Sequence, residues 1–259
     1  MDKKILSQVS DEQKKLAISK IIDTANLASK HFEAKFTHFL DPAVAYFAQN
    51  HLYFDADLQI SFWGGYEGAE RQVLCCAPEW DTVSEKDFPI ACIKSHGSAF
   101  HTLAHRDYLG ALMGLGITRE QVGDITVNGE TAYIFCKEDI APYILQNLSK
   151  VGADGVRLER IDCAQAVVKE EQVKELTITV ASLRLDAVLA GALNIPRSAG
   201  AELVKSCRVS VNFEPCVNLS RILSCGDLIS ARGFGRLKIS KIEGTSRKGR
   251  TFIRVVRYI

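Results

Sequence analysis

The spacing of apolar residues predicts two helices near the start of the chain. Apolar side chains recur at helical intervals between residues 9 and 30, and Asp41-Pro42 marks the start of a second helix over residues 42 to 51. Alternating segments then predict two strands, Leu58 to Trp63 and Arg71 to Ala77. We assign residues 1 to 80 to a small N-terminal α/β unit.

The next segment has a more regular order of elements. Its patterns predict, in sequence, a strand over Pro89 to Ser95, a helix over Thr102 to Leu115, strands over Asp124 to Asn128 and Thr131 to Cys136, a helix over Ala141 to Lys150, and a strand over Val156 to Ile161. This β-α-β-β-α-β order is typical of a ferredoxin-like or RRM-like sandwich, to which we assign residues 81 to 171. The fold class is therefore α+β.

Two aromatic residues on the third predicted strand of this sandwich share one face. RRM domains bind RNA through aromatic side chains on their first and third strands, and Tyr133 and Phe135 occupy such positions. The first strand carries no aromatic residue, and the basic-glycine-aromatic signature is missing. The sequence therefore favours packing over RNA binding as the role of both rings.

Residues 172 to 259 predict a third domain, which begins with a strand or linker over Gln172 to Val180. A short amphipathic helix follows, because apolar residues recur at helical spacing and Asn194-Ile195-Pro196 then stops it; its stripe is Leu185, Val188, Leu189, Ala192 and Leu193. A second helix is expected from Arg197 or Ser198, with Ser198 as its N-cap. At 100° per residue, one arc of this helix carries Arg197, Lys205 and Arg208, with Val204 as an exception, and the other carries Ala199, Leu203 and Cys207.

Strands complete this domain. Alternation at Val209, Val211 and Phe213 predicts the first, and Leu228 to Arg232 the second. The turn Gly233-Phe234-Gly235-Arg236 can bring backbone amides and a guanidinium close to an anion. A final hairpin is expected to turn at Gly244 to Gly249 and to return through Phe252 to Tyr258. We expect two helices packed on a small twisted sheet.

Charge distinguishes this domain from the rest of the chain. Residues 181 to 259 carry fourteen Lys and Arg against five Asp and Glu, while residues 1 to 180 carry eighteen against twenty-six. A basic module within a nearly neutral protein indicates binding to the phosphates of a nucleic acid. The predicted RNA-binding residues are Arg184, Arg197, Ser198, Lys205, Arg208, Arg232, Gly233, Phe234, Gly235 and Arg236. For Phe234, stacking on a base and capping a core edge both remain open.

Three motifs in this region resemble the S4 RNA-binding domain: LRLDAVL, PRSAGAELVKSCRVSVN and GDLISARGFGR. Phe213 departs from the pattern, because many S4 domains have glycine there, and it predicts a longer or differently shaped turn. With GGYEGAER (Gly64 to Arg71) and HRDYLGALMGLGITREQVGDI (His105 to Ile125), the chain resembles the YlmH family of bacterial S4-domain proteins. The resemblance implies binding to ribosomal RNA or tRNA on the large ribosomal subunit, a role in ribosome-associated quality control, and a genetic link to cell division.

No catalytic, metal or cofactor site is predicted. His101 and His105 have the spacing of paired zinc ligands, but the sequence implies no third ligand. Arg184-Leu185-Asp186 matches the triplet of pseudouridine synthases, yet it opens a short helix, where Asp186 favours helix-start electrostatics or an ion pair. The alternatives are an RNA-modifying enzyme with a site in residues 1 to 160, around His101, His105 and Asp107, and a cell-division scaffold.

The remaining features concern location and assembly. The N-terminus has no apolar core of a signal peptide, and no stretch reaches the roughly 18 apolar residues of a membrane span, which favours a cytoplasmic protein without membrane contact. The eight cysteines form no CxxC pair, so we expect reduced, mostly buried thiols. The absence of heptads favours a monomer.

Overall fold

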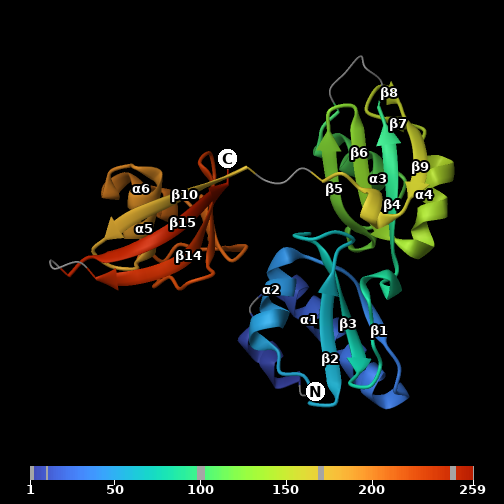
Figure 1. Ribbon diagram of the computed structural model, residues 1–259, viewed down its shortest axis with the longest axis horizontal. Helices are drawn as coiled ribbons and strands as arrows, with labels where there is room; N and C mark the ends of the chain where they lie inside the picture. Colours follow the sequence, from blue (N-terminus) through green and yellow to red (C-terminus); the bar gives the residue numbers. More distant parts are fainter. Residues whose placement is uncertain (1–2, 10, 98–102, 169–171, 246–248, 259) are drawn as a thin grey trace. The chain divides into compact units, whose positions relative to one another are not determined.

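The computed structural model of the chain describes residues 3–9, 11–97, 103–168, 172–245 and 249–258. The chain forms two compact units, Met1–Lys169 and Glu170–Ile259 (Figure 1). Both combine helices with antiparallel sheets, in agreement with the predicted α+β class. Each unit has its own buried hydrophobic core.

The first part of the first unit consists of two helices on a three-stranded sheet. Asp11 and Asp41 accept hydrogen bonds from backbone amides at the starts of α1 (Glu12–His31) and α2 (Pro42–His51), so both helices begin at capped ends. The strands lie in the order β1-β3-β2. Their bounds are Lys35–Leu40 for β1, Leu58–Trp63 for β2 and Gln72–Pro78 for β3. Strand β1 was not predicted, whereas the other four elements were.

The second part of this unit has the predicted order of elements. Its strands are β4 (Ile90–His96), β5 (Val122–Asn128), β6 (Thr131–Lys137) and β9 (Arg157–Ile161), and its helices are α3 (His105–Gly114) and α4 (Ala141–Asn147). A small hairpin, β7 (Lys150–Val151) with β8 (Asp154–Gly155), precedes β9. The main sheet has the order β5-β6-β4-β9, and its helix-facing side forms one core with α3 and α4. Short 3-10 turns occur at η1 (Lys3–Gln8), η2 (Glu85–Asp87), η3 (Arg119–Gln121), η4 (Glu138–Ile140) and η5 (Cys163–Gln165).

The other face of this sheet carries Tyr133 and Phe135, for which the sequence favoured packing over RNA binding. Phe135 is fully buried and Tyr133 is 6% exposed, in a cluster with Cys92. Side chains from the Tyr66 loop and from the segment after β9, Cys163, Ala166 and Val168, pack over them. The packing interpretation of Tyr133 and Phe135 is therefore confirmed.

The second unit is a six-stranded sheet with two helices on one face. The strand order is β10-β15-β14-β13-β11-β12, and all pairs are antiparallel. The strands are β10 (Val173–Val180), β11 (Val209–Val211), β12 (Glu214–Pro215), β13 (Leu228–Ala231), β14 (Gly235–Thr245) and β15 (Thr251–Tyr258). Helix α5 (Leu185–Leu193) buries the predicted stripe and ends at Asn194 in the left-handed conformation. The segment predicted as a strand or linker over Gln172 to Val180 is the strand β10, which pairs with β15.

Helix α6 (Arg197–Lys205) differs from the prediction in two respects. Its N-cap is Pro196, so Ser198 lies inside the helix and makes no capping hydrogen bond. Its buried residues are Gly200, Leu203 and Val204, whereas Ala199 and Cys207 are exposed. The reason is the packing of Gly200, where an added Cβ would lie 3.1 Å from the carbonyl oxygen of Asp186 on α5. Close contact between the helix backbones, which the apolar pattern does not encode, sets the rotation of α6.

The turn between β11 and β12 was expected to be longer or differently shaped, and of these two alternatives the longer loop is wrong. Val211 pairs with Glu214, which leaves a two-residue turn of Asn212 and Phe213. Both residues have positive φ angles, 53° and 67°, as a type I′ turn requires. Asn212 is fixed by hydrogen bonds to Asp227 and Leu228, so Phe213 must adopt a conformation that suits glycine.

Substitution of Phe213 by glycine is expected to stabilise the second unit. Glycine adopts a positive φ without the steric cost of a side chain, so we expect the free energy of unfolding to rise by about 0.5 to 1 kcal/mol. Chemical denaturation followed by circular dichroism measures this change. Phe213→Ala is the control, because it retains the Cβ; an equal gain in both variants would assign the effect to the ring and contradict backbone strain.

Candidate nucleic-acid interface

One buried carboxylate holds two of the predicted RNA-binding arginines. Asp186, at the start of α5, is 5% exposed. Its two oxygens lie 3.2 Å from Arg184 Nε and 2.9 Å from an Arg197 terminal nitrogen. Burial alone would raise the pKa of Asp186, but the hydrogen bonds from both arginines outweigh it and lower the pKa below its ordinary value. The carboxylate is therefore ionised at neutral pH, and the predicted ion pair of Asp186 is confirmed.

The arginines keep part of their surface available. Their side chains are 37% exposed for Arg184 and 57% exposed for Arg197. Asp186 thus orients two guanidinium groups at the junction of α5 and α6 while leaving them in contact with solvent. A guanidinium fixed in this way loses less conformational entropy when it binds a phosphate.

Arg208 belongs to a second group, away from the helix. Because α6 ends at Lys205, Arg208 lies outside the helix, directly before β11, and the predicted single helical arc of Arg197, Lys205 and Arg208 is wrong. A terminal nitrogen of Arg208 donates a 2.9 Å hydrogen bond to the carbonyl oxygen of Arg232. At Gly233, an added Cβ would meet that guanidinium at 3.2 Å, and the φ of 90° also favours glycine. Gly233 thus leaves room for the Arg208 guanidinium, and the guanidinium in turn holds the carbonyl oxygen at the start of this turn.

This second group surrounds a hollow of about 400 Å³. Outward side chains of three neighbouring strands line it, with Ser210, Ser230 and Arg236 in one cross-strand row. Arg208, Arg232, Gly233 and Gly235 complete the wall. A concavity with three guanidinium groups and two hydroxyl groups suits a phosphate, since both kinds of group donate hydrogen bonds to its oxygens.

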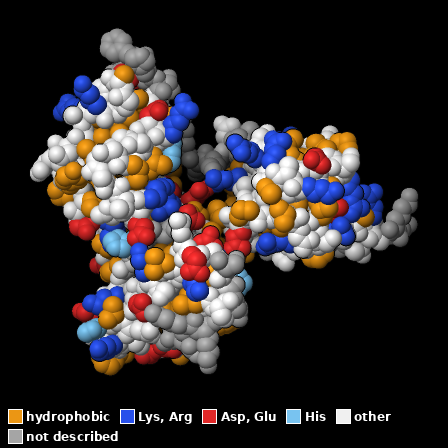
Figure 2. All heavy atoms as spheres, turned by 180° about the vertical axis from the view of Figure 1, so that it is seen from behind, with side chains coloured by type: hydrophobic (Ala, Val, Ile, Leu, Met, Phe, Trp, Pro, Cys, Tyr) orange, Lys and Arg blue, Asp and Glu red, His pale blue; other side chains and the backbone are white. Residues whose placement is uncertain are grey.

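The structure thus places the predicted residues in two groups. Arg184 and Arg197 lie beside Asp186. The hollow is lined by Arg208, Arg232, Gly233, Gly235 and Arg236. Ser198 and Lys205 belong to neither group and are exposed on α6. Phe234 is partly buried and packs against the core of the unit, which is the packing alternative for this ring. Figure 2 shows clusters of Lys and Arg side chains over the visible face of this unit.

Sequence reasoning missed two serines that line the hollow and one lysine that lies beside it. Ser210 and Ser230 carry no charge, so the basic pattern did not select them, yet both line the hollow. Lys238 follows Arg236 at the alternate position of β14 and is exposed. The signal was strand alternation, in which Arg236 and Lys238 share the face opposite the buried Leu237.

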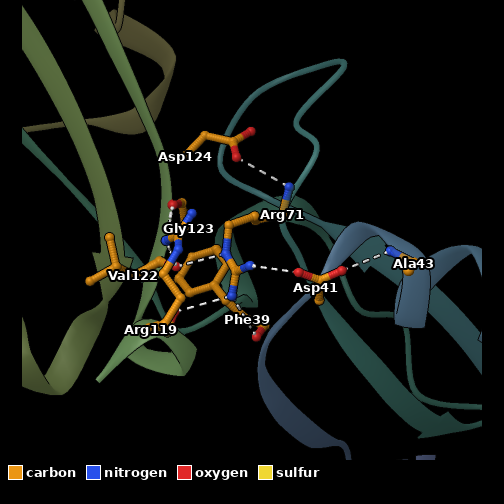
Figure 3. Close-up of polar contacts among 8 residues, drawn as sticks. All are labelled: Phe39, Asp41, Ala43, Arg71, Arg119, Val122, Gly123 and Asp124. Carbon is orange, nitrogen blue, oxygen red and sulfur yellow. Dashed lines mark hydrogen bonds and ion pairs between the residues drawn. The ribbon is translucent and has the colours of Figure 1, made fainter. Parts of the chain in front are cut away.

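The two upstream motifs meet at a network inside the first unit, shown in Figure 3. Arg71, which ends GGYEGAER, is 6% exposed and donates hydrogen bonds to the carbonyl oxygens of Val122 at 3.0 Å and Arg119 at 3.1 Å. Another contact reaches Phe39 at 3.4 Å, and Asp41 lies 3.6 Å away as an ion-pair partner. Burial lowers the pKa of Arg71 to about 10, with Arg119 as a further cause, so the guanidinium stays charged at neutral pH.

Asp124 occupies the other side of this network. Its carboxylate accepts hydrogen bonds from the Tyr66 hydroxyl at 2.8 Å and from the backbone amides of Glu70 and Arg71 at 2.7 and 3.2 Å. Arg119 in turn donates to the carbonyl oxygens of Val122 and Gly123. We call Asp41, Tyr66, Arg71, Arg119 and Asp124 the Arg71 junction, because they join the two parts of the first unit.

Two glycines make this junction possible. At Gly65 an added Cβ would lie 2.5 Å from the Phe135 ring, and the φ of 100° is unfavourable for other residues. At Gly123 an added Cβ would lie 2.6 Å from the ring of Phe39. Gly65 and Gly123 therefore serve close packing between two layers, and the motifs meet in a structural joint.

The alternative active site was placed around His101, His105 and Asp107. The Asp107 carboxylate accepts a 2.8 Å hydrogen bond from the Ala104 amide and so caps α3. Partial burial and Arg119 lower the pKa of His105, and His101 lies outside the described residues. Among the described residues, no group of three or more His, Cys, Asp or Glu side chains is arranged to hold a metal ion.

Most cysteines of the chain are buried thiols. Burial raises the pKa of Cys75 to about 11 and that of Cys76 and Cys92 to about 12, so these thiols are protonated at neutral pH. Cys136 and Cys216 are also buried, whereas Cys207 and Cys225 are exposed. Within the described part of the chain, every helix is too short or too polar to cross a membrane.

Comparisons with known proteins cover nearly the whole chain. One family model, described as "Putative RNA-binding domain in YlmH", matches residues 84–165, and a second, "YlmH, N-terminal", matches residues 13–79. The chain is 34% identical over 232 residues to the "Ribosome-associated protein quality control protein P2" of Bacillus subtilis, covering 89% of this chain and 90% of that protein. A solved structure, "Cell division protein ylmH from Streptococcus pneumoniae", matches with a TM-score of 0.51 and 19% identity, covering 61% of this chain and 97% of that one. The last likeness concerns the fold alone.

Proposed function

The chain belongs to the YlmH family, and from this premise we propose that it is a non-enzymatic RNA-binding protein that docks on structured RNA of the large ribosomal subunit. The similar protein from Bacillus subtilis is named for ribosome-associated quality control, which suggests the same setting, in the cytoplasm. The proposed RNA partner is ribosomal RNA or tRNA, and the protein acts as a monomer.

The observation that carries this proposal is the arginine arrangement of the second unit. In our proposal this unit is an S4 domain, since two helices pack on one face of its sheet and the motifs match. Arg184 and Arg197, oriented by Asp186, bind phosphates beside α5 and α6, together with Lys205. Arg208, Arg232, Arg236 and the Gly233 to Gly235 amides bind a further phosphate in the hollow.

The first unit has a different role in this proposal. Residues 84–165 match a model named for RNA binding, and we propose an RRM-like domain there. Its aromatic sheet face is covered by Cys163, Ala166 and Val168, so stacking of bases on Phe135 would require that segment to move. In this proposal the first unit contacts ribosomal protein or a feature of tRNA, or its acidic charge keeps the second unit from binding RNA indiscriminately.

Cosedimentation with purified ribosomal subunits tests the proposal. If six phosphates are neutralised, the affinity should fall with a log–log salt slope on the order of −4 to −5. We expect the protein to pellet with the large subunit at low salt and to remain in the supernatant at high salt. Protein without ribosomes and isolated small subunits are the controls. A salt-independent pellet, or equal binding to both subunits, would contradict the proposal.

A further inference from the structure

The sheet of the second unit has an outer face opposite α5 and α6. Residues that alternate with the buried core point to this face, because side chains of a strand project to opposite sides in turn. Ile253 and Val255 of β15 are fully buried in the core, whereas Arg254 between them is exposed. On β14, Lys238 and Lys241 are exposed, and Phe252 of β15 is 36% exposed.

This outer face is strongly cationic. Strand pairing sets Lys238 opposite Val256 and Lys241 opposite Arg254, so the charges lie on adjacent strands. Arg254 also lies 2.8 Å from Glu243, which fixes its guanidinium over the sheet. Alternation places six cations on this face, Arg208, Arg232, Arg236, Lys238, Lys241 and Arg254, against two carboxylates, Glu175 and Glu243.

Apolar side chains are interleaved with these charges. Phe252, Val256 and Tyr258 occupy alternate positions of β15 on the same outer face as Arg254. Cations beside flat apolar surfaces are the combination that binds an unpaired strand, since phosphates contact the cations while bases stack on rings. A duplex buries its bases inside the helix and cannot use the rings in this way.

The outer face is continuous with the hollow described above. Ser210, Ser230 and Arg236 form one cross-strand row in the wall of the hollow, and Lys238 follows Arg236 two residues along β14. We propose that an unpaired RNA strand runs from the hollow across the outer face of the sheet, over Lys238 and Lys241 toward Phe252. This inference rests on the proposed RNA-binding function and adds a second contact surface to it, on the side of the sheet away from Asp186.

The experiment compares two RNAs on the full-length protein. One is a short hairpin with blunt ends, and the other is the same hairpin with an unpaired extension of about eight nucleotides, within the range of single-strand sites. Two lysine–phosphate contacts supply a salt slope of about 1.5, which is about 30-fold in affinity at 0.1 M salt, and stacking on Phe252 supplies about tenfold more, so we expect the extension to raise the affinity by about 300-fold. Fluorescence anisotropy across a salt series measures both quantities.

Two variants separate the outer face from the rest of the protein. Lys238→Gln/Lys241→Gln should reduce the gain from the extension about 30-fold and leave affinity for the blunt hairpin unchanged. Phe252→Leu should reduce the gain about tenfold through lost stacking, with little change in the salt slope. Lys15→Gln/Lys30→Gln on α1, the matched control, should retain the full gain.

The outcomes distinguish this inference from the proposed function. Equal affinity of the wild type for both RNAs, or a gain of undiminished size in Lys238→Gln/Lys241→Gln, would overturn the outer-face path. The function would then still stand on binding to the blunt hairpin. Failure of the wild type to bind either RNA would overturn the proposed function itself. An equal gain from a double-stranded extension would show that the face binds duplex and would also overturn the path.

Discussion

Replacement of Arg71 by methionine is expected to lower the free energy of unfolding of the first unit by about 3 to 5 kcal/mol, as for other broken buried ion networks. Methionine fills a similar volume but donates no hydrogen bond. The carbonyl oxygen of Arg119 would lose the Arg71 donor, that of Val122 would keep only the bond from Arg119, and Asp41 would lose its ion pair with Arg71. For a unit of this size the midpoint of thermal unfolding should fall by roughly 8 to 15 °C.

Tryptophan fluorescence makes this measurement specific to one unit. The two tryptophans of the chain, Trp63 and Trp80, both lie in the first unit, so their signal reports its unfolding alone. Arg160→Met is the matched control, because Arg160 forms an ion pair with Glu138 in which both side chains are about half exposed. Such a pair contributes about 0 to 1 kcal/mol.

The Arg71→Lys variant separates charge from geometry. Lysine keeps the positive charge but lacks the planar set of donors that reaches several carbonyl oxygens at once. We expect an intermediate loss of stability. A loss in Arg71→Met no larger than in Arg160→Met would contradict the assignment of the Arg71 junction as the joint between the two parts.

Local patterns predicted most elements, and the reasons are visible in particular residues. Helix α2 begins at Asp41-Pro42 and α5 ends at Asn194, where a cap and a left-handed residue act within one turn of the chain. The stripe of α5 faces a single core, so its five apolar positions were all correct. Elements whose start, end and buried face depend on neighbours in sequence can be predicted from sequence.

Elements that depend on distant contacts could not be predicted. Strand β1 escaped notice because its pairing with β3 shifts register between Phe36 and Phe39, which interrupts the alternation of buried residues. The buried face of α6 was misassigned because Gly200 carries no apolar signal, although it packs against α5. In both places the contact partner lies elsewhere in the chain, and the pattern of one segment does not contain it.

In the candidate interface, too, local sequence predicted some features, and others depended on contacts between distant segments. Excess Lys and Arg identified the second unit and most of its cations, because charge is read directly from composition. Their grouping required the register of β11, β13 and β14, which places Ser210, Ser230 and Arg236 in one row. An ion pair was one of the two roles predicted for Asp186, but only the packing of α5 against α6 shows that Arg197 is one of its partners.

The largest expected loss of RNA affinity belongs to the variant Arg197→Ala/Lys205→Ala/Arg208→Ala. It removes one cation beside Asp186, one on the last turn of α6 and one from the wall of the hollow. Three lost phosphate contacts should make the log–log salt slope less steep by about 2 to 3 and lower affinity for the large subunit at 0.1 M salt by about 100- to 500-fold. The comparison uses cosedimentation at two salt concentrations.

The matched control removes the same charge from another surface. Lys15→Ala/Lys20→Ala/Lys30→Ala changes three lysines of α1, and the exposed partners Glu12 and Glu120 contribute little stability. If attraction to the net charge of the protein explained binding, both triple variants would lose affinity equally, and the assignment of the arginines would be wrong. A selective loss in the first variant, with a circular dichroism spectrum that shows a folded second unit, would instead show that binding depends on where these three cations lie.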